Sequence, residues 1–256
     1  VELDSDGNWY VLRGTPKQIG RRHHATGTWQ MLPIGLYPHS IVVAHDDRIW
    51  FNGHFTRDPE LIGSVTPDGE QVRTLPVPPH PTMATIPGGP IPYELRQGPD
   101  GRIWMSELQR NRIVSYDQRT NHFTTHTLPT SWSGPRRLDV GPDGSVWIPA
   151  YSANLLVRFD PRTETFREIP LPVPDAVPYV VRVDPRNGAV WIATAAGDVV
   201  LRYDPATGAF TQWPLPSRGA LVRHLAVDPK TGDVWLAYGA SPSRIPARIA
   251  RVRPEP

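Results

Sequence analysis

The feature that most constrains the fold is a repeated motif, a turn rich in Asp and Gly that leads into a hydrophobic residue and a tryptophan. Its four plain copies are GPDGRIW (98–104), GPDGSVW (141–147), DPRNGAVW (184–191) and DPKTGDVW (228–235), and two weaker copies, LDSDGNW (3–9) and AHDDRIW (44–50), precede them. Their tryptophans, at 9, 50, 104, 147, 191 and 235, are 41, 54, 43, 44 and 44 residues apart. A period of roughly 40 to 50 residues is typical of a four-stranded propeller blade, so the repeat predicts an all-β propeller of six blades. We expect the tryptophans to pack between neighbouring sheets.

Each copy of the motif belongs to a unit that reads as four short strands. The hairpin precedes the tryptophan strand, a third strand such as NRIVSYD (111–117) follows, and turns such as DPRTETF (160–166) lead to a fourth strand that ends in proline. The 44-residue spacings have one more residue in the first hairpin, Pro-Arg-Asn-Gly or Pro-Lys-Thr-Gly in place of Pro-Asp-Gly. We therefore expect a single propeller domain over residues 1–256.

The two ends of the chain do not complete a blade. Val1 to Leu3 read as the tail of an innermost strand, and RIARVRP (248–254) reads as a third strand without a fourth. Because an incomplete blade has an open edge, we expect residues upstream of Val1 to supply the outer strand, or a seventh blade to lie outside this sequence.

The 54-residue spacing contains an insertion, VPPHPTMATIPGGPIP (77–92). It is too rich in Pro and Gly for a regular element. We expect it to form a loop that leaves the sheets between the second and third blades and acts as a lid or a spacer.

Composition and charge argue against several classes of protein. In 256 residues, 31 prolines and 21 glycines demand many turns, and the lack of cysteine excludes disulfides and thiolate metal sites. The net charge of +2 gives little support for binding to nucleic acid. No apolar run approaches the roughly 20 residues that cross a bilayer. We expect a monomer with no membrane span, periplasmic or secreted in preference to cytoplasmic.

A large polar residue begins the first strand of five blades, eleven or twelve residues before the tryptophan: His39, Tyr93, Arg136, Tyr179 and Arg223. In a propeller the first strand lines the central channel, so equal register predicts that these side chains meet at one mouth. They form either a small-molecule pocket or a set of side chains that fill the channel through mutual hydrogen bonds. A neutral imidazole accepts a proton near neutral pH and arginine stabilises an anion, so His39 is the candidate base.

The repeat as a whole, with its Pro-Asp-Gly-x-(Ile/Val)-Trp hairpin and its Asp-Pro-x-Thr-Gly turn, resembles the streptogramin lyases, that is, the virginiamycin B lyase family. The resemblance covers nearly the whole chain. It implies an enzyme that opens a cyclic depsipeptide by elimination at its ester, with Mg²⁺ held by two glutamates and with a histidine base in a Pro-His pair. Pro38-His39 is the repeat copy with that pair, so the resemblance also assigns the base to His39.

The chain departs from the family pattern at the metal ligands. Tyr37 stands where the first glutamate is expected, and the second falls at His54 or at the loop carboxylates Asp58 and Glu60. The carboxylates nearest to the expected pocket are Glu94 and Glu107, which makes them candidate ligands of Mg²⁺ or another divalent cation. Glu107 has a plainer alternative role, a pair with a backbone N–H or with an arginine of the next blade.

Two functions follow from these observations. The first is a carbon-oxygen lyase or an esterase or lactonase that acts on an ester or cyclic depsipeptide in the channel, with His54 and His224 joining the polar set as substrate-binding residues. The second is a noncatalytic binding or scaffold propeller within a longer secreted protein. The five polar residues of the first strands favour the first function, and the incomplete repeats at both ends favour the second.

Overall fold

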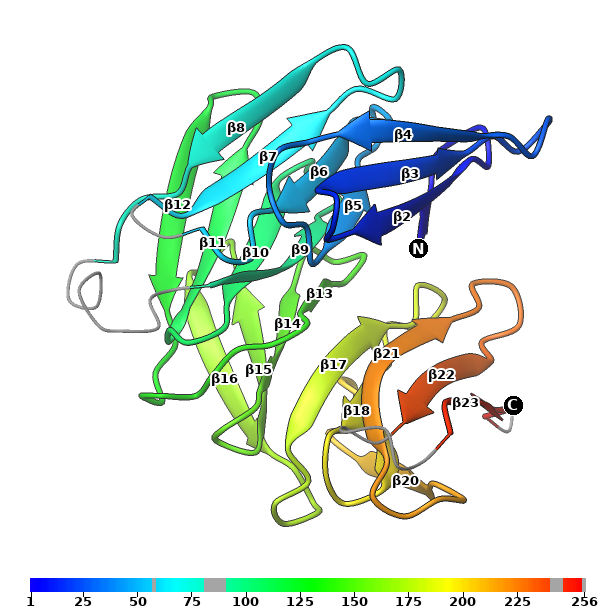
Figure 1. Cartoon of the computed structure of the whole chain (residues 1–256). Coiled ribbons are helices and arrows are strands. Elements are labelled where there is room, and N and C mark those ends of the chain that lie inside the picture. Colours follow the sequence, from blue (N-terminus) through cyan, green and yellow to red (C-terminus); the bar gives the residue numbers. More distant parts are fainter. Residues whose placement is uncertain (57–58, 81–90, 240–245, 255–256) are drawn as a thin grey trace. The chain divides into compact units, whose positions relative to one another are not determined.

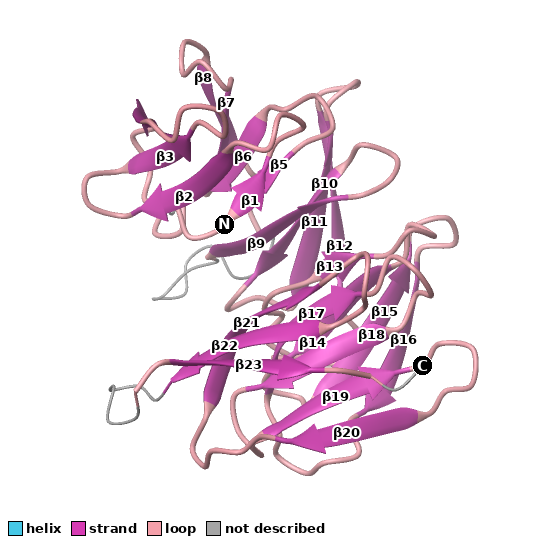
Figure 2. Ribbon diagram, turned by 90° about the vertical axis from the view of Figure 1, so that its right-hand side faces the viewer, coloured by secondary structure: helices cyan, strands magenta, loops and turns pink. Residues whose placement is uncertain are grey.

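The computed structural model describes residues 1–256 with the exception of 57–58, 81–90, 240–245 and 255–256. Its described elements are all β-strands, joined by turns and loops (Figure 2). The strands form six separate antiparallel sheets in chain order, which confirms the predicted all-β fold of six propeller blades. Within the described ranges, no helix is long and apolar enough to cross a membrane.

Contacts within the chain cluster into two compact units, an N-terminal unit (1–127) and a C-terminal unit (128–256), with three sheets each (Figure 1). The sheets of the N-terminal unit are β1 (Glu2–Leu3), β2 (Trp9–Arg13), β3 (Gln18–Arg22) and β4 (Trp29–Pro33); β5 (Ile41–Val43), β6 (Ile49–Asn52), β7 (Leu61–Val65) and β8 (Val72–Pro76); and β9 (Pro92–Gln97), β10 (Ile103–Glu107), β11 (Arg112–Asp117) and β12 (His122–Thr127).

The sheets of the C-terminal unit are β13 (Asp139–Val140), β14 (Val146–Ala150), β15 (Leu155–Asp160) and β16 (Thr165–Pro170); β17 (Pro178–Val183), β18 (Val190–Thr194), β19 (Val199–Tyr203) and β20 (Phe210–Pro214); and β21 (Leu221–Val227), β22 (Val234–Gly239) and β23 (Arg248–Val252). The last sheet has three strands among the described residues, whereas the other five have four. This agrees with the expectation that the final repeat stops one strand short.

The first hairpin of each repeat follows its turn residues. In the Pro-Asp-Gly copies the amide of Gly101 donates to the carbonyl of Gly98, and Gly101 has a φ of 83°. In the longer copies the amide of Gly188 donates one residue further back, to the carbonyl of Asp184. A positive φ is costly for residues with a Cβ, which explains the glycine at this point. The extra turn residue thus accounts for the 44-residue spacing, as predicted.

The repeated tryptophans occupy one register in five of the sheets. Each lies three residues after a positive-φ residue and is the second residue of its strand: Trp50, Trp104, Trp147, Trp191 and Trp235. The first four are buried, and Trp50 and Trp147 pack on tyrosines of the following sheet at 5.4 Å and 5.8 Å between ring centroids. The predicted packing between sheets is therefore confirmed for these two. Trp235 is 43% exposed, and among the described residues no sheet follows its own in the C-terminal unit.

In the first repeat the position of the repeated tryptophan is taken by a tyrosine. Tyr10, not Trp9, lies three residues after the positive-φ Gly7. Tyr10 is fully buried in the core shared by the first two sheets, whereas Trp9 is 46% exposed on the opposite face. Since successive side chains of a strand point to opposite faces, an offset of one residue exchanges the core face for the open one. The assignment of Trp9 to the repeat was therefore wrong by one position.

The insertion at 77–92 is described only at its two ends, and residues 81–90 lie outside the described part of the chain. At the first end the amide of Val77 donates to the carbonyl of Glu60 at 2.8 Å, and Val77 is buried. At the other end, Pro92 is already the first residue of β9. The loop expected for this insertion stays a prediction.

Candidate functional site

In three sheets a β-bulge in the first strand leaves one of the predicted site residues outside the regular pairing. In β9, Ser106 pairs with Glu94 and Glu107 pairs with Pro92, so Tyr93 is the extra residue. The ladders of β17 and β21 skip Tyr179 and Arg223 in the same way. A bulged residue is left outside the regular pairing, and its side chain is turned away from the alternation of the strand. The three residues, which the sequence places at equal register, thus share the same backbone irregularity.

His39 and His54 form a stacked imidazole pair in the N-terminal unit. Their ring centroids are 4.2 Å apart with an interplanar angle of 14°, and Tyr93 lies against His39 at 4.4 Å. The Nδ1 atoms of His39 and His54 lie 3.2 Å from the carbonyl oxygens of Tyr93 and Pro92. Because a carbonyl oxygen can only accept, each Nδ1 carries its proton and Nε2 holds the lone pair in the neutral ring. In its neutral form His39 would therefore accept a proton at Nε2.

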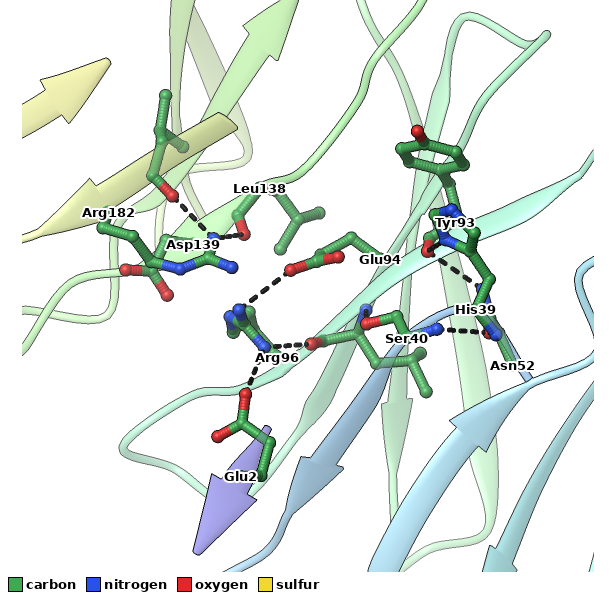
Figure 3. A network of polar contacts seen from close by, with 12 residues as sticks. Glu2, His39, Ser40, Asn52, Tyr93, Glu94, Arg96, Leu138, Asp139 and Arg182 are labelled. Atoms are coloured by element: carbon green, nitrogen blue, oxygen red, sulfur yellow. Dashed lines mark hydrogen bonds and ion pairs between the residues drawn. The ribbon is translucent and has the colours of Figure 1, made fainter. Parts of the chain in front are cut away.

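Asn52 holds the backbone around this imidazole pair, and Figure 3 shows it beside His39, Ser40 and Tyr93. Its side-chain amide donates to the carbonyl oxygens of Pro92 at 2.6 Å and Tyr93 at 2.9 Å, and its Oδ1 accepts from the amides of His39 and Ser40, both at 2.9 Å. Asn52 is fully buried at the end of β6. It fixes the start of the histidine strand against the first residues of β9. The sequence prediction missed Asn52, whose signal is an amide in the otherwise apolar strand IWFN (49–52).

An aromatic rim continues from the imidazole pair toward solvent. Tyr37 lies 4.9 Å from Phe55, and Phe55 meets His54 edge-on at 4.6 Å. Tyr37 also packs on Gly14 so closely that a Cβ at that glycine would lie 2.4 Å from the tyrosine ring. Phe55 is 59% exposed. The site therefore presents apolar ring surface beside the proton-accepting histidine.

The two carboxylates proposed as cation ligands are engaged with arginines. Glu94 accepts from Arg96 at 2.9 Å, and Arg96 also reaches Glu2 at 3.2 Å (Figure 3). Glu107 is fully buried and both of its oxygens accept from Arg112, one of them at 2.6 Å from Nε. Arg112 belongs to the neighbouring strand of the same sheet and not to the next blade, because β10 and β11 bring the two side chains to one sheet end. The ion pair satisfies the charge of Glu107.

Glu60 is a second buried carboxyl group near Arg112. Its Oε1 lies 3.9 Å from Arg112, and its Oε2 has no hydrogen-bond partner among the described residues. Burial, together with the negative charge of Glu107, raises the pKa of Glu60 to about 8, against the opposing effect of Arg112. Because the two-point contact with Arg112 favours ionised Glu107, the proton of this cluster resides on Glu60 at neutral pH.

The C-terminal unit repeats the arrangement of the histidine pair with different side chains. Arg136 precedes β13 as His39 precedes β5, and its guanidinium lies 4.0 Å from the ring centroid of Tyr151 and 5.2 Å from that of Tyr179. Tyr151 follows the tryptophan by four residues, as His54 does. Tyr151 was not predicted from the sequence, although its distance of four residues from Trp147 is a signal that could have identified it.

Arg223 and His224 are exposed on β21. The structure thus brings His39, His54 and Tyr93 together in one unit, and Arg136 and Tyr179 together in the other. The shared mouth predicted for all five first-strand residues involves both units and stays a prediction.

The comparisons with known proteins agree on the fold. The sequence model of the virginiamycin B lyase family matches residues 82–251. A catalytically inactive virginiamycin B lyase from Staphylococcus aureus, solved with quinupristin, is similar with a TM-score of 0.80 and 22% identity over 92% of this chain and 75% of that chain. A streptogramin B lyase is similar with a TM-score of 0.79 and 20% identity over 100% and 82% of the two chains.

The same fold is found in proteins of other kinds. A chain of the mitotic checkpoint complex is similar with a TM-score of 0.73 and 15% identity over 93% of this chain and 69% of that chain. The search of curated proteins gives no match. At these identities the likeness to solved structures establishes the fold and leaves the activity to the residues of the site.

The described side chains do not fit the Mg²⁺ that the family resemblance implies. Mg²⁺ prefers oxygen ligands in octahedral geometry, but the chain has Tyr37 and His54 at expected glutamate positions, and both rings are in aromatic contacts. Asp58 lies outside the described residues, and Glu60 lies beside Arg112. The part of the chain that the structure describes holds no group of three His, Asp or Glu side chains able to bind a metal ion.

Proposed function

The chain belongs to the virginiamycin B lyase family, and from this membership and the histidine site we propose that it cleaves the ester bond of a small molecule such as a cyclic depsipeptide, with His39 as general base. The observation that carries the proposal is the tautomer of His39. Its Nδ1–H donates to the carbonyl of Tyr93, so the proton-accepting lone pair is on Nε2.

The base supports elimination as follows. His39 Nε2 takes the proton from the carbon next to the one that bears the ester oxygen, and the electron pair of that C–H bond forms a carbon-carbon double bond. The carbon-oxygen bond then breaks and the carboxylate leaves with its electrons. No atom is gained or lost, so the opened product has the mass of the substrate. Hydrolysis by a water activated at the same nitrogen would give a product heavier by one water.

The aromatic rim favours a substrate with apolar rings. Tyr37 and Phe55 offer ring surface next to the base, and such surface binds apolar and aromatic groups by burial and edge or face contacts. The solved lyase with quinupristin makes that compound the first substrate to test.

The test is to incubate the full chain with quinupristin and to follow ring opening by liquid chromatography and mass spectrometry. We expect a product of unchanged mass, and we expect His39→Ala to abolish it while the Tm changes little, because His39 is only half-buried. Ser40→Ala, at the neighbouring buried position, is a control for damage to the strand. Turnover that survives His39→Ala would exclude His39 as the base.

A noncatalytic binding function is the second candidate, and the departures at Tyr37 and His54 favour it. Aromatic rings in place of glutamates preserve a binding surface but remove two hard oxygen ligands. Saturable binding of quinupristin without any product, equally in the parent chain and in His39→Ala, would establish this function in place of catalysis.

A further inference from the structure

The free edge of β12 lacks the protection that the edges of the other sheets have. β12 is the outermost strand of the third sheet, and all six of its residues pair with β11 without a bulge (Figure 1). Its sequence, HFTTHT, contains no proline and no Lys, Arg, Asp or Glu. Charged residues, prolines and bulges are the devices that keep native edge strands from pairing with another chain. β12 has none of the three.

The four other outer strands that the structure describes end in a proline at one shared register. This proline pairs with the first residue of the third strand, as Thr127 pairs with Arg112; the four are Pro33, Pro76, Pro170 and Pro214. Proline has no N–H and cannot donate to the ladder, so it is tolerated where the backbone faces the open edge. Thr127 therefore brings an N–H group to a place where the other outer strands have none.

The alternation of the backbone defines the other groups on this edge. In β8 the amide of Val77, the residue after Pro76, donates back across the sheet to the carbonyl of Glu60 at 2.8 Å. Successive residues direct their N–H and C=O groups to opposite sides, so Pro76 and, at the same register, Thr127 point outward. The outward groups of β12 are thus those of Phe123, Thr125 and Thr127. In the part of the chain that the structure describes, these three residues have no hydrogen bond outside the ladder with β11.

We propose that β12 is the contact surface for a second copy of this chain, with the two strands antiparallel about a two-fold axis at Thr125. In this register Thr125 lies opposite Thr125 of the partner subunit, and Phe123 lies opposite Thr127 of the partner subunit. Threonine pairs and pairs of an aromatic with a β-branched residue are favourable across strands. Both copies contribute the same groups, as a closed two-fold dimer requires. The dimer replaces the monomer expected from the sequence and does not depend on His39 or on ester cleavage.

The test is the mass of the full chain in solution, measured by analytical ultracentrifugation. A contact between two strand edges belongs to the small and weak class of interfaces, so the range should run from about 5 µM to about 500 µM. We expect the mass to rise with concentration from the 28.6 kDa of one chain toward twice this value. The amides of residues 122–127 should also exchange more slowly with deuterium at the high concentration. A mass of one chain at every concentration would overturn the proposal.

Charge variants at the two-fold axis test the register. Thr125→Lys brings two ammonium groups opposite each other and should weaken association roughly tenfold or more, and Thr125→Glu should do the same with two carboxylates. An equal mixture of the two variants should associate again, because opposite charges then meet. A mixture that stays monomeric would overturn the proposal.

The matched control is Thr74→Lys. Thr74 lies two residues before Pro76 in β8, as Thr125 lies two residues before Thr127, and it is also exposed. Thr74→Lys should associate like the parent chain, and equal weakening by Thr74→Lys and Thr125→Lys would contradict a contact through β12. Should Thr125→Lys fail to fold, as judged by circular dichroism, Thr127→Pro takes its place and must weaken association for the proposal to stand.

Discussion

Replacing Glu60 by Gln should remove a pH-dependent loss of stability. In the folded chain the pKa of Glu60 is raised to about 8 from its ordinary 4.5, mainly by burial and then by the charge of Glu107. The folded state thus keeps a proton that the unfolded state releases, so the contribution of Glu60 to the free energy of unfolding is fully present below about pH 4.5 and is lost as the pH rises through about 8. At about 1.4 kcal/mol per pKa unit, the loss above pH 8 is at most about 5 kcal/mol.

Gln has the shape of a protonated Glu and cannot ionise. Glu60→Gln should therefore match the parent chain near pH 5 and exceed its stability at pH 9 by up to about 5 kcal/mol. The opposing titration of His80, whose pKa is lowered mainly by burial, is common to both chains and cancels in the difference.

Urea unfolding from about pH 5 to about pH 9, followed by tryptophan fluorescence, measures this difference. Glu70→Gln, at an exposed position in the hairpin between β7 and β8, is the matched control and should run parallel to the parent chain. Parallel curves for Glu60→Gln and the parent chain would refute the assignment of the proton to Glu60.

Three further substitutions test the structure. Asn52→Leu removes four hydrogen bonds of a buried amide and should cost about 3 kcal/mol or more in urea unfolding, with loss of the histidine chemical shifts typical of a fixed tautomer. Tyr10→Ala should cost about 3–5 kcal/mol, but Trp9→Ala roughly 1 kcal/mol, and the reverse order would contradict the corrected register. Gly63→Ala would place a Cβ 2.4 Å from the Phe51 ring and 3.0 Å from a backbone oxygen, so its free energy of unfolding should fall by an amount typical of overpacking, about 1–3 kcal/mol in urea unfolding.

Turn chemistry explains why the six sheets could be predicted from the sequence. The Asp and Gly residues determine the turn in which they lie. The hairpin that ends at Gly188 has one residue more than the hairpin that ends at Gly101, both in the sequence and in the span of its hydrogen bond. The turn glycine also identifies Tyr10, which lies three residues after Gly7 as Trp104 lies three residues after Gly101. The prediction from the tryptophans placed Trp9 on the core face instead, because the first copy has one residue fewer between its glycine and its tryptophan.

The candidate site was harder to predict, since its side chains meet across strands that are distant in sequence. His39 was identified from its register, but its contact with His54 and the support from Asn52 depend on the carbonyls of Pro92 and Tyr93 in the next sheet. For Glu107 an arginine partner was predicted in the next blade, whereas the β10 and β11 ladder pairs it with Arg112 of its own sheet. Local patterns specify strands and turns, whereas buried ion pairs and amide bridges depend on packing.

The bulges at Tyr93, Tyr179 and Arg223 show that one backbone irregularity can carry very different side chains. The ladder skips each of these residues, with two phenols and one guanidinium on the same kind of backbone. The two tyrosines are buried, whereas Arg223 is exposed. A library randomised at codon 223 should therefore retain a high proportion of folded members, whereas substitutions at codons 93 and 179 must also fill the space of a phenol ring.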